Sequence, residues 1–242
     1  MSDHTIKAFD ADLDGLSRMI ADMGGLAEKQ TADAMVALAR RDEGLAQRVI
    51  SSDAKIDALQ HEIEQQAIQT IARRQPLAID LREVIGALRI SNDLERIGDL
   101  AKNIAKRVPA VGKDLRPQQV MRGLENMNNL VLGQLKNVLD GYARRDVETA
   151  LAVRNSDEQI DAVNNSLFRE LLTYMMEDPS NISFCIHLVF CAKNIERMGD
   201  HATNIAETVY FIIEGRMLSD ERPKGDTTSE TTIPFGLERR LS

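Results

Sequence analysis

Four pairs of acidic residues, each spaced four positions apart, are the side chains of this 242-residue protein with the clearest chemical potential. The pairs are Asp53/Asp57, Glu95/Asp99, Asp157/Asp161 and Glu196/Asp200. In a helix, residues four apart lie on one face, so each pair brings two like charges together. Such a pair costs only about 0.2–0.5 kcal/mol of helix stability, so the repulsion by itself does not prove a function. Recurrence of the pairs in both halves of the chain is the stronger signal.

Two of these pairs continue into an asparagine. Glu95, Asp99 and Asn103 fall on one strip of a helical wheel. The second half repeats the strip, as Glu196, Asp200 and Asn204. Carboxylate and amide oxygens are hard ligands suited to Mg²⁺, Mn²⁺, Ca²⁺ or iron. In each half, the aspartate pair of the preceding helix could face this strip and close a cation site, with the asparagines as possible extra donors.

A second interpretation of the same acids is that neighbouring arginines neutralise them. Arg96 and Arg197 each follow the glutamate of a strip, and spacing alone leaves both interpretations open. Gly98 and Gly199 precede the aspartates, although a glycine within a helix costs about 1 kcal/mol relative to alanine. A glycine kept at that position in both halves indicates close approach of a backbone or a ligand.

Sequence signatures of enzymes are not found. There is no Glu-x-x-His of the di-iron bundles, no phosphate-binding Gly-x-x-x-x-Gly-Lys loop, no Gly-x-Gly-x-x-Gly and no Gly-x-Ser-x-Gly. His201 has no counterpart in the first half and is interpreted as a surface or packing residue. Cys185 and Cys191 lie in an apolar run and are expected to be buried, reduced thiols. We therefore expect a protein that is not an enzyme.

Composition predicts the fold class and limits the partners. Aromatic residues make up 4% of the chain, and helix-favouring residues dominate, so an all-α protein is expected. The formal charge of −8 argues against nucleic-acid binding and against direct adhesion to anionic lipid, and favours cations or basic protein surfaces. No apolar run is long enough to cross a bilayer, and residues 1–14 are unlike a signal peptide. A cytoplasmic location is expected.

Self-similarity determines the predicted organisation. Arg40-Arg41-Asp42 and the Ser52-Asp53-x-x-Ile56-Asp57 motif return 104 positions later. Glu95-Arg96-Ile97-Gly98-Asp99 and Asn103-Ile104-Ala105 return 101 positions later, in the same order. Chance matches would not keep order and spacing over three helices. The chain is therefore predicted to be a duplicated three-helix unit.

Apolar periodicity and turn residues delimit the predicted helices. They run from the N-terminal region to about 38, then over about 42–73, 77–107, 118–143, 147–177 and 181–217. Pro109, Gly112 and Pro117 mark a linker, and residues from 219 onward lose periodicity. We predict two tandem, similar three-helix bundles in a spectrin-repeat-like arrangement, comprising residues 1–110 and 111–218, followed by a flexible tail at 219–242.

Longer motifs carry a family resemblance. The segments Leu94-Glu95-Arg96-Ile97-Gly98-Asp99 and Ile195-Glu196-Arg197-Met198-Gly199-Asp200-His201-Ala202-Thr203-Asn204 resemble the paired signatures of the PhoU family. Gln75-Pro76-Leu77-Ala78-x-Asp80-Leu81-Arg82 resembles the turn that opens that family's third helix. The similarity covers about residues 5–215. The first copy departs from the fuller second motif, with Leu100, Lys102 and Lys106 where the second has His201, Thr203 and Glu207.

The resemblance implies a function. Family members are cytoplasmic negative regulators of the phosphate-starvation response, acting between a high-affinity phosphate ABC transporter, through its ATPase subunit, and a membrane sensor histidine kinase. It implies that the protein reaches the membrane only through these partners. A homodimer is plausible because long bundles offer extended side faces.

The resemblance also implies bound metal, since some members carry iron or zinc on these motifs, and manganese or magnesium would suit the same oxygens. The ligands carried over are the eight acids of the four pairs. The three departures of the first copy imply that the two sites differ in charge, affinity or occupancy. Two alternatives stay open, a carboxylate-bridged, phosphatase-like metalloenzyme and a metal or phosphate buffer.

Overall fold

The structure, a computed structural model, describes residues 2–111 and 118–218, with side chains from residue 9 onward. The first half contains α1 (Ser2–Arg40), α2 (Glu43–Arg74), α3 (Ile79–Ala105) and the short 3₁₀ helix η1 (Val108–Ala110). The second half contains α4 (Gln118–Arg144), α5 (Val147–Asn155), α6 (Asp157–Glu177), the 3₁₀ helix η2 (Pro179–Asn181) and α7 (Ile182–Glu214). The described residues form no strand, so the all-α prediction is confirmed. Part of the predicted linker and the whole predicted tail lie outside the described residues.

The repeated Arg-Arg-Asp motif forms the turn between the first two helices of each repeat. Arg41 and Arg145 take positive φ values of 56° and 54°, which ends the preceding helix. Asp42 Oδ1 then accepts a hydrogen bond from the backbone N–H of Leu45 (2.8 Å), and Asp146 caps its helix in the same way. The motif therefore recurs because both turns need a left-handed residue followed by an N-cap.

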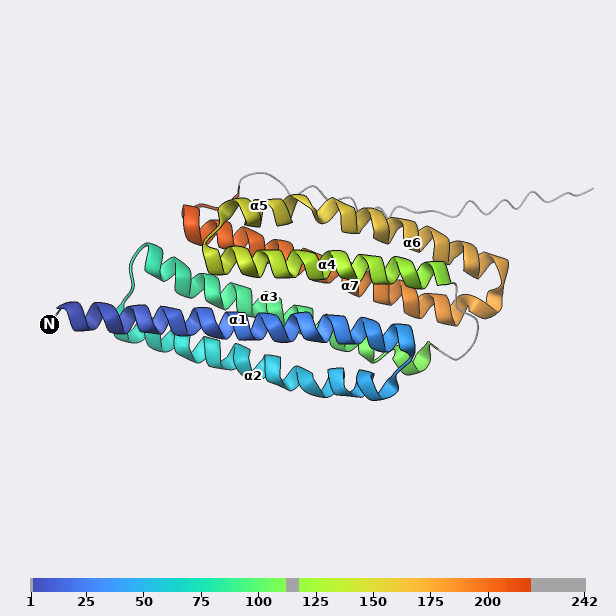
Figure 1. The fold of residues 1–242 in the computed structure, drawn as a ribbon, viewed down its shortest axis with the longest axis horizontal. Coiled ribbons are helices and arrows are strands. Elements are labelled where there is room, and N and C mark those ends of the chain that lie inside the picture. The colour runs from blue at the N-terminus through green and yellow to red at the C-terminus, as the bar shows by residue number, and fades with distance from the viewer. Residues whose placement is uncertain (1, 112–117, 219–242) are drawn as a thin grey trace, which may run out of the picture.

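One predicted helix is interrupted. The segment 147–177, predicted as a single helix, is divided into α5 and α6 at Ser156. The backbone N–H of Ser156 is shared between the carbonyls of Ala152 and Val153 (both 3.1 Å), and its hydroxyl donates to Val153 O (2.8 Å). This sharing tightens the turn locally toward a 3₁₀ geometry. The axis continues, and α5 and α6 together occupy the place of α2 (Figure 1).

Helix ends differ by a few residues from prediction. The third helix begins at Ile79 where Leu77 was predicted, because Ala78 has a φ of 49° that a helix cannot accommodate. The last helix ends at Glu214, three residues before the predicted 217, because Gly215 adopts a φ of 73° and caps it.

The two repeats lie side by side, with α3 and α7 adjacent in the middle of the molecule (Figure 1). These two helices run antiparallel, since Arg82 near the start of α3 donates to the carbonyl of Ile212 near the end of α7 (3.3 Å). At the other end of α3, Arg107 lies 3.3 Å from His187 near the start of α7. Equivalent helices of a translational repeat would be parallel. The antiparallel contact therefore indicates a pseudo-twofold relationship, one of the two arrangements that the repeat allowed.

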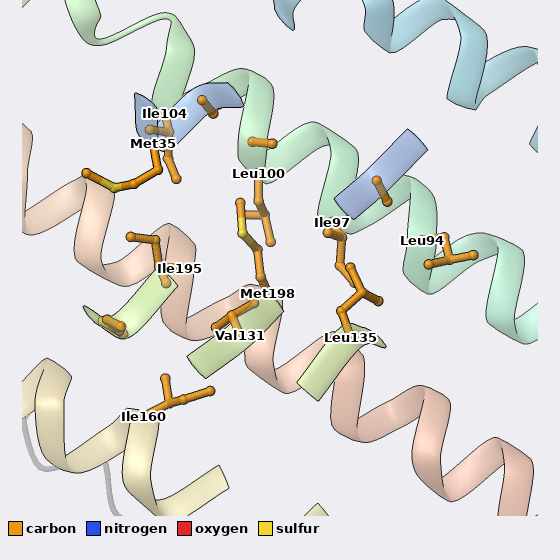
Figure 2. Close-up of a cluster of buried hydrophobic side chains, with 14 of the residues drawn as sticks. Met35, Leu94, Ile97, Leu100, Ile104, Val131, Leu135, Ile160, Ile195 and Met198 are labelled. Atoms are coloured by element: carbon orange, nitrogen blue, oxygen red, sulfur yellow. The ribbon is translucent and has the colours of Figure 1, made fainter. Parts of the chain in front are cut away.

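The hydrophobic core continues across this seam. Side chains from α1, α3, α4, α6 and α7 meet in one cluster (Figure 2), in which the labelled residues are Met35, Leu94, Ile97, Leu100, Ile104, Val131, Leu135, Ile160, Ile195 and Met198. All of them are buried. Burial of apolar area on this scale is the main stabilising contribution to the fold. Cys185 and Cys191 are buried free thiols, as predicted. Within residues 2–111 and 118–218, no helix is apolar over a length sufficient to span a bilayer.

Candidate functional site

The acidic pairs of the first repeat meet where α2 crosses α3. Gly98 makes this crossing possible, because a Cβ there would lie 2.9 Å from Ile56 Cδ1 and 3.1 Å from Gln30 Oε1. The same hypothetical atom would lie 3.6 Å from Asp53 Oδ1, so α3 approaches the aspartate of α2 along the glycine. Gly98 does meet close neighbours, but they are side chains of the first two helices of its own repeat and not the backbone or ligand that was predicted.

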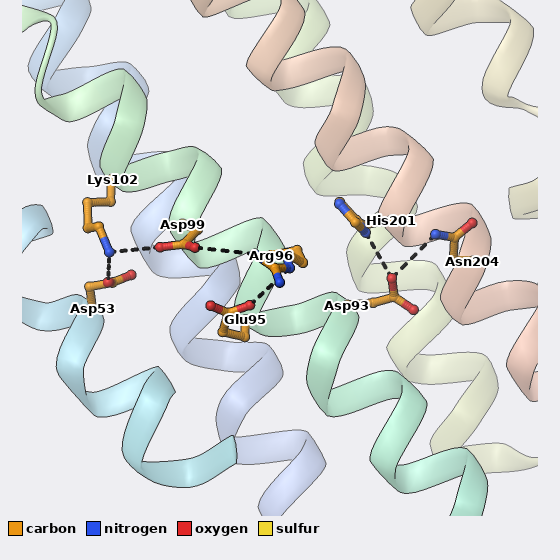
Figure 3. Close-up of polar contacts among 8 residues, drawn as sticks. All are labelled: Asp53, Asp93, Glu95, Arg96, Asp99, Lys102, His201 and Asn204. Atoms are coloured by element: carbon orange, nitrogen blue, oxygen red, sulfur yellow. Dashed lines mark hydrogen bonds and ion pairs between the residues drawn. The ribbon is translucent and has the colours of Figure 1, made fainter. Parts of the chain in front are cut away.

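Lys102 links the two acidic pairs of this repeat (Figure 3). Its ammonium donates to Asp99 Oδ1 (2.7 Å) on its own helix and also to Asp53 Oδ2 on α2. The Asp53 side chain is 7% exposed and that of Lys102 23%, so the ion pair is largely shielded from water. The cation that balances these acids is thus supplied by the protein itself.

Arg96 contributes a second, more exposed positive charge. Its guanidinium lies 3.5 Å from Glu95 and 3.9 Å from Asp99, while more than half of the side chain stays exposed. The interpretation that an arginine neutralises the strip therefore holds for this repeat. Arg197, at the equivalent place in the second repeat, is exposed.

The titration properties of the first strip follow from burial and crowding. Desolvation raises the pKa of Glu95, and the neighbouring charge of Asp99 raises it further. Burial and the charge of Asp53 likewise raise the pKa of Asp57. Burial alone would raise the pKa of Asp99, but hydrogen bonding and attraction from Lys102 outweigh burial and lower that pKa. Its bonds to Asp53 and Asp99 raise the pKa of Lys102, so this side chain is charged at neutral pH.

The second repeat has the same helix crossing and buries its acids more deeply. A Cβ at Gly199 would lie 2.9 Å from Ile160 Cδ1 and 3.7 Å from Asp157 Oδ1, closely matching the distances at Gly98. Asp157, Asp161 and Glu196 are all buried. Their exposed fractions of 4–6% mean that each charge requires compensation.

Different residues surround the second strip. Thr203 occupies the place of Lys102, and its hydroxyl lies 3.4 Å from Asp157 Oδ1. Lys193 Nζ donates to Glu196 Oε1 (2.8 Å). The buried Arg154 pairs with Glu207 (3.3 Å), one helical turn beyond Thr203. In the second repeat the position between the strip and Asp157 is therefore occupied by a hydroxyl in place of an ammonium group.

The predicted asparagine donors lie at a different place. Asn103 and Asn204 are both exposed, and Asn204 Nδ2 donates to Asp93 Oδ1 (3.3 Å) across the seam. His201 Nδ1 lies 2.8 Å from the same oxygen (Figure 3). The structure thus gives Asn204 and His201 a role in joining α3 to α7. A metal-ligand role for the two asparagines stays a prediction.

Two glutamines beside the strips were not predicted from the sequence. Gln30 and Gln134, from the first helix of each repeat, are buried, and each donates from Nε2 to a serine hydroxyl of the second helix (both 3.0 Å). The serines are Ser52 and Ser156. Within the described residues the Oε1 atom of each glutamine has no hydrogen-bond donor, and it faces the crossing at Gly98 or Gly199. In the sequence, Gln30 and Gln134 are 104 positions apart, which is the same offset that relates the aspartate motifs.

The metal ion that the resemblance implies would need several oxygen ligands around one point. As placed, no three His, Cys, Asp or Glu side chains gather around one point anywhere in the described ranges. In the first repeat, Lys102 already binds the carboxylates that a metal would need. In the second, Lys193 likewise binds Glu196, while Gln134 Oε1 and Asp157 Oδ1 both lie near Gly199. In both strips a lysine is thus bound to an acidic residue, and metal binding stays a prediction.

Comparison with known proteins assigns the family. The PhoU domain matches residues 20–108 and again 124–209, one match per repeat. The phosphate-specific transport system accessory protein PhoU homolog of Rhizobium meliloti is 57% identical over 226 residues, covering 93% of this chain and 95% of the relative. The homolog of the same name from Caulobacter vibrioides is 49% identical, covering 95% of this chain and all of the relative.

Two crystal structures share the fold. PhoU from Pseudomonas aeruginosa superposes with a TM-score of 0.81 at 38% identity, covering 86% of this chain and all of that one. The phosphate transport system regulatory protein PhoU from Streptococcus pneumoniae superposes with a TM-score of 0.80 at 28% identity, covering 87% and 99%. Two domain matches, near-complete coverage of the relatives and these superpositions agree, and the chain belongs to the PhoU family.

Proposed function

We propose that this protein is a cytoplasmic negative regulator of the phosphate-starvation response. It would link a high-affinity phosphate ABC transporter to a sensor histidine kinase and modulate phosphate uptake. The observation that carries the proposal is the 57% identity, over 93% of the chain, to a protein named as an accessory of the phosphate-specific transport system. The two PhoU domain matches, which include both acidic strips, support the same role.

Exposed apolar side chains support docking on protein partners. Ile68, Leu77 and Ile79 are 65%, 79% and 44% exposed around the turn that joins α2 to α3. Met176, Ile182 and Ile186 are exposed around the equivalent turn of the second repeat. We propose these side chains as contacts for a protein partner, because exposed apolar side chains gain from burial at an interface. In this proposal the protein is not an enzyme. It acts by binding the kinase and the transporter's ATPase subunit, and reaches the membrane only through them.

Metal binding is a component of the proposal. Cations on the carboxylates would stabilise the crossing of the second and third helices, because they offset the mutual repulsion of buried acids. A homodimer is a further component, tested by the molar mass of the purified protein in solution.

Gene deletion tests the regulatory role. In phosphate-rich medium, deletion should switch on phosphate-starvation genes, and loss of the sensor kinase should abolish this effect. Wild-type protein supplied in trans is the control and should restore silencing. Equal induction in a strain that also lacks the kinase would exclude action through it.

Affinity capture tests the contacts directly. The kinase and the ATPase subunit should copurify with the wild-type protein and be depleted with the Leu77→Asp/Ile79→Asp variant, whose helical content should be unchanged. Specific binding of the purified protein to starvation-gene promoters would contradict the adaptor mechanism.

A further inference from the structure

A groove lies between α1 and α4, at the end of the molecule where α3 begins and α7 ends. The two helices lie side by side (Figure 1), and the groove has a volume of about 950 Å³. Apolar side chains from α1, α4 and α7 line it, namely Leu13, Ala21, Leu139, Val209, Ile212 and Ile213. Gly25 also lines the groove, and a Cβ there would meet nothing within 4 Å, so the space is open at this point.

The shape of the groove suits a peptide. Leu13, Leu139 and Ile213 pack against the core but are only partly buried, so an occupant that covers them gains about 25 cal/mol per Å² of apolar surface removed from water. Lining residues of α1 extend from Asp10 to Glu28, which is about 27 Å of helix. An extended peptide of about eight residues has this length.

The rim of the groove carries more acid than base. The described lining residues include five acids and three bases. Two of the bases are held in ion pairs within the rim, Arg145 with Glu83 and Lys136 with Asp140. The remaining acids are therefore in excess.

These remaining acids all come from α1. They are Asp10, Asp14 and Glu28, and the third base, Arg18, donates to the backbone carbonyl of Asp14 (3.2 Å). Burial raises the pKa of Glu28, because its charged form loses hydration. A cation that entered the groove would stabilise the charged forms of these carboxyl groups. The rim therefore favours a cationic occupant.

The chain itself contains a segment of matching chemistry, outside the described residues. Residues 233–242 read Ile-Pro-Phe-Gly-Leu-Glu-Arg-Arg-Leu-Ser. Their two arginines outnumber the single acid, and Ile233, Leu237 and Leu241 recur at every fourth position, the spacing of one helical face. Apolar and cationic groups in one short segment complement an apolar floor with an acidic rim.

The segment is also attached within reach of the groove. Ile212 and Ile213 line the groove at the end of α7, and the described chain ends at residue 218. A flexible chain from residue 218 to residue 233 has a root-mean-square span of about 20 Å. Such a tether gives an effective concentration of about 1 mM, so an affinity of only about 0.1 mM would keep the segment bound about nine tenths of the time.

We propose that residues 233–242 bind in the groove between α1 and α4 of the same molecule. The apolar side chains of the segment cover the floor, and Arg239 and Arg240 meet the acids of α1. The bound segment covers this face of the bundle, so a partner that uses the groove must displace it. The inference goes beyond the regulatory role proposed above and does not depend on it.

A tryptophan reporter tests the inference in the full-length protein, because the sequence contains no Trp. In Phe235→Trp protein, acrylamide should quench the fluorescence several-fold less than in a synthetic peptide of residues 229–242 with the same substitution. Adding Gly25→Leu, which fills the groove, should raise quenching toward that of the peptide. Gly133→Leu, at an equally open glycine of α4 outside the groove, is the matched control and should leave quenching low.

Charge reversal tests the two sides of the contact. In the reporter protein, Asp10→Lys/Asp14→Lys should raise quenching, and so should Arg239→Glu/Arg240→Glu, because each places like charges together. Combining the two double substitutions should lower quenching again, since opposite charges then face each other. A purely structural effect of either double substitution would not be rescued in this way.

A charge-matched control addresses the net charge of the protein. Glu62→Lys/Glu64→Lys makes the same change at exposed positions of α2 and should leave quenching low. Circular dichroism should show unchanged helical content in every variant, because all of the substituted helical positions are exposed.

Three outcomes would overturn the inference. Equal quenching in the protein and the peptide would show that the segment is not bound. Protection that survives both Gly25→Leu and the charge reversals would place the segment elsewhere on the molecule. Protection that disappears on dilution would assign the groove to the segment of a second copy and exclude the contact within one molecule.

Discussion

Gly98 of α3 and Gly199 of α7 meet the same set of partners in their respective repeats. Each faces an isoleucine Cδ1, a glutamine Oε1 and an aspartate Oδ1 contributed by the first two helices. The isoleucines, Ile56 and Ile160, are buried and have little room to move. This shared triplet brings the third helix close enough for its acidic strip to reach the aspartate of the second.

The close approach predicts the effect of adding one methyl group. Gly98→Ala should destabilise the protein by about 1 kcal/mol, because overpacking costs about 1–3 kcal/mol and the gain in helix propensity returns only part of it. Gly15→Ala is the matched control, since a Cβ there would meet nothing within 4 Å, and it should stabilise by about 0.5–1 kcal/mol. Urea unfolding measures both. Equal effects of the two substitutions would disprove the packing role of Gly98.

Lys102 should contribute to stability through Asp53. Lys102→Met should cost about 3 kcal/mol in metal-free buffer, because it leaves a buried carboxylate without its cation. Asp53→Asn should reduce that penalty, so a double-mutant cycle of the two substitutions should give a coupling energy of about 1–3 kcal/mol. Additive effects would mean that the two groups do not interact in solution.

Asp146 should make stability depend on pH. Hydrogen bonds from the side chain and backbone of Thr149 lower its pKa below the ordinary 3.8. A lowered folded-state pKa contributes stability above the unfolded value, and this contribution is lost as pH falls through the folded value. Asp146→Ala should therefore be less stable than wild type at pH 7, with a gap that closes below about 3.8. Asp146→Asn is the control, which keeps an N-cap acceptor without titrating.

Asp93 should join the two repeats. Asp93→Ala should destabilise by about 1–3 kcal/mol, because Asn204 and His201 lose a shared acceptor in the partly buried seam. Asn194→Ala, at the equivalent position of α7, is the comparison and should have a smaller effect. Hydrogen exchange of amides in α3 and α7 would localise the loss. Unchanged protection in both helices would place the effect of Asp93→Ala elsewhere.

Most of the fold is predictable because the sequence contains two copies of the same three-helix unit. The motif offsets identify three equivalent helices per repeat. The repeated glycine beside the strip predicts a close approach, although the groups that approach it are side chains and not a backbone or a ligand. The same offset of 104 relates Gln30 to Gln134, so these two buried glutamines were also predictable from the repeat. The break at Ser156 was not predictable from pattern, since Ser52 makes the same hydroxyl contact within an unbroken α2.

The contents of the site were harder to predict. Lys102 occupies the sequence position equivalent to Thr203. A lysine side chain can reach several neighbours, however, and only the packing of α2 against α3 determines that Lys102 bridges Asp53 and Asp99. Asn204 lies at the edge of its strip on a helical wheel. Its contact with Asp93 depends on how the two repeats pack, and the periodicity of a single helix carries no information about that packing.

The antiparallel seam of α3 and α7 gives the molecule the geometry of a symmetric dimer whose two subunits have been joined into one polypeptide. In a true homodimer every substitution appears twice, once on each side of the axis. Joining the halves removes that constraint, so Asp93 faces Asn204 and His201 while Asn194 stands at the position related to Asp93. The fusion thereby lets each half acquire its own chemistry while the scaffold keeps its symmetry.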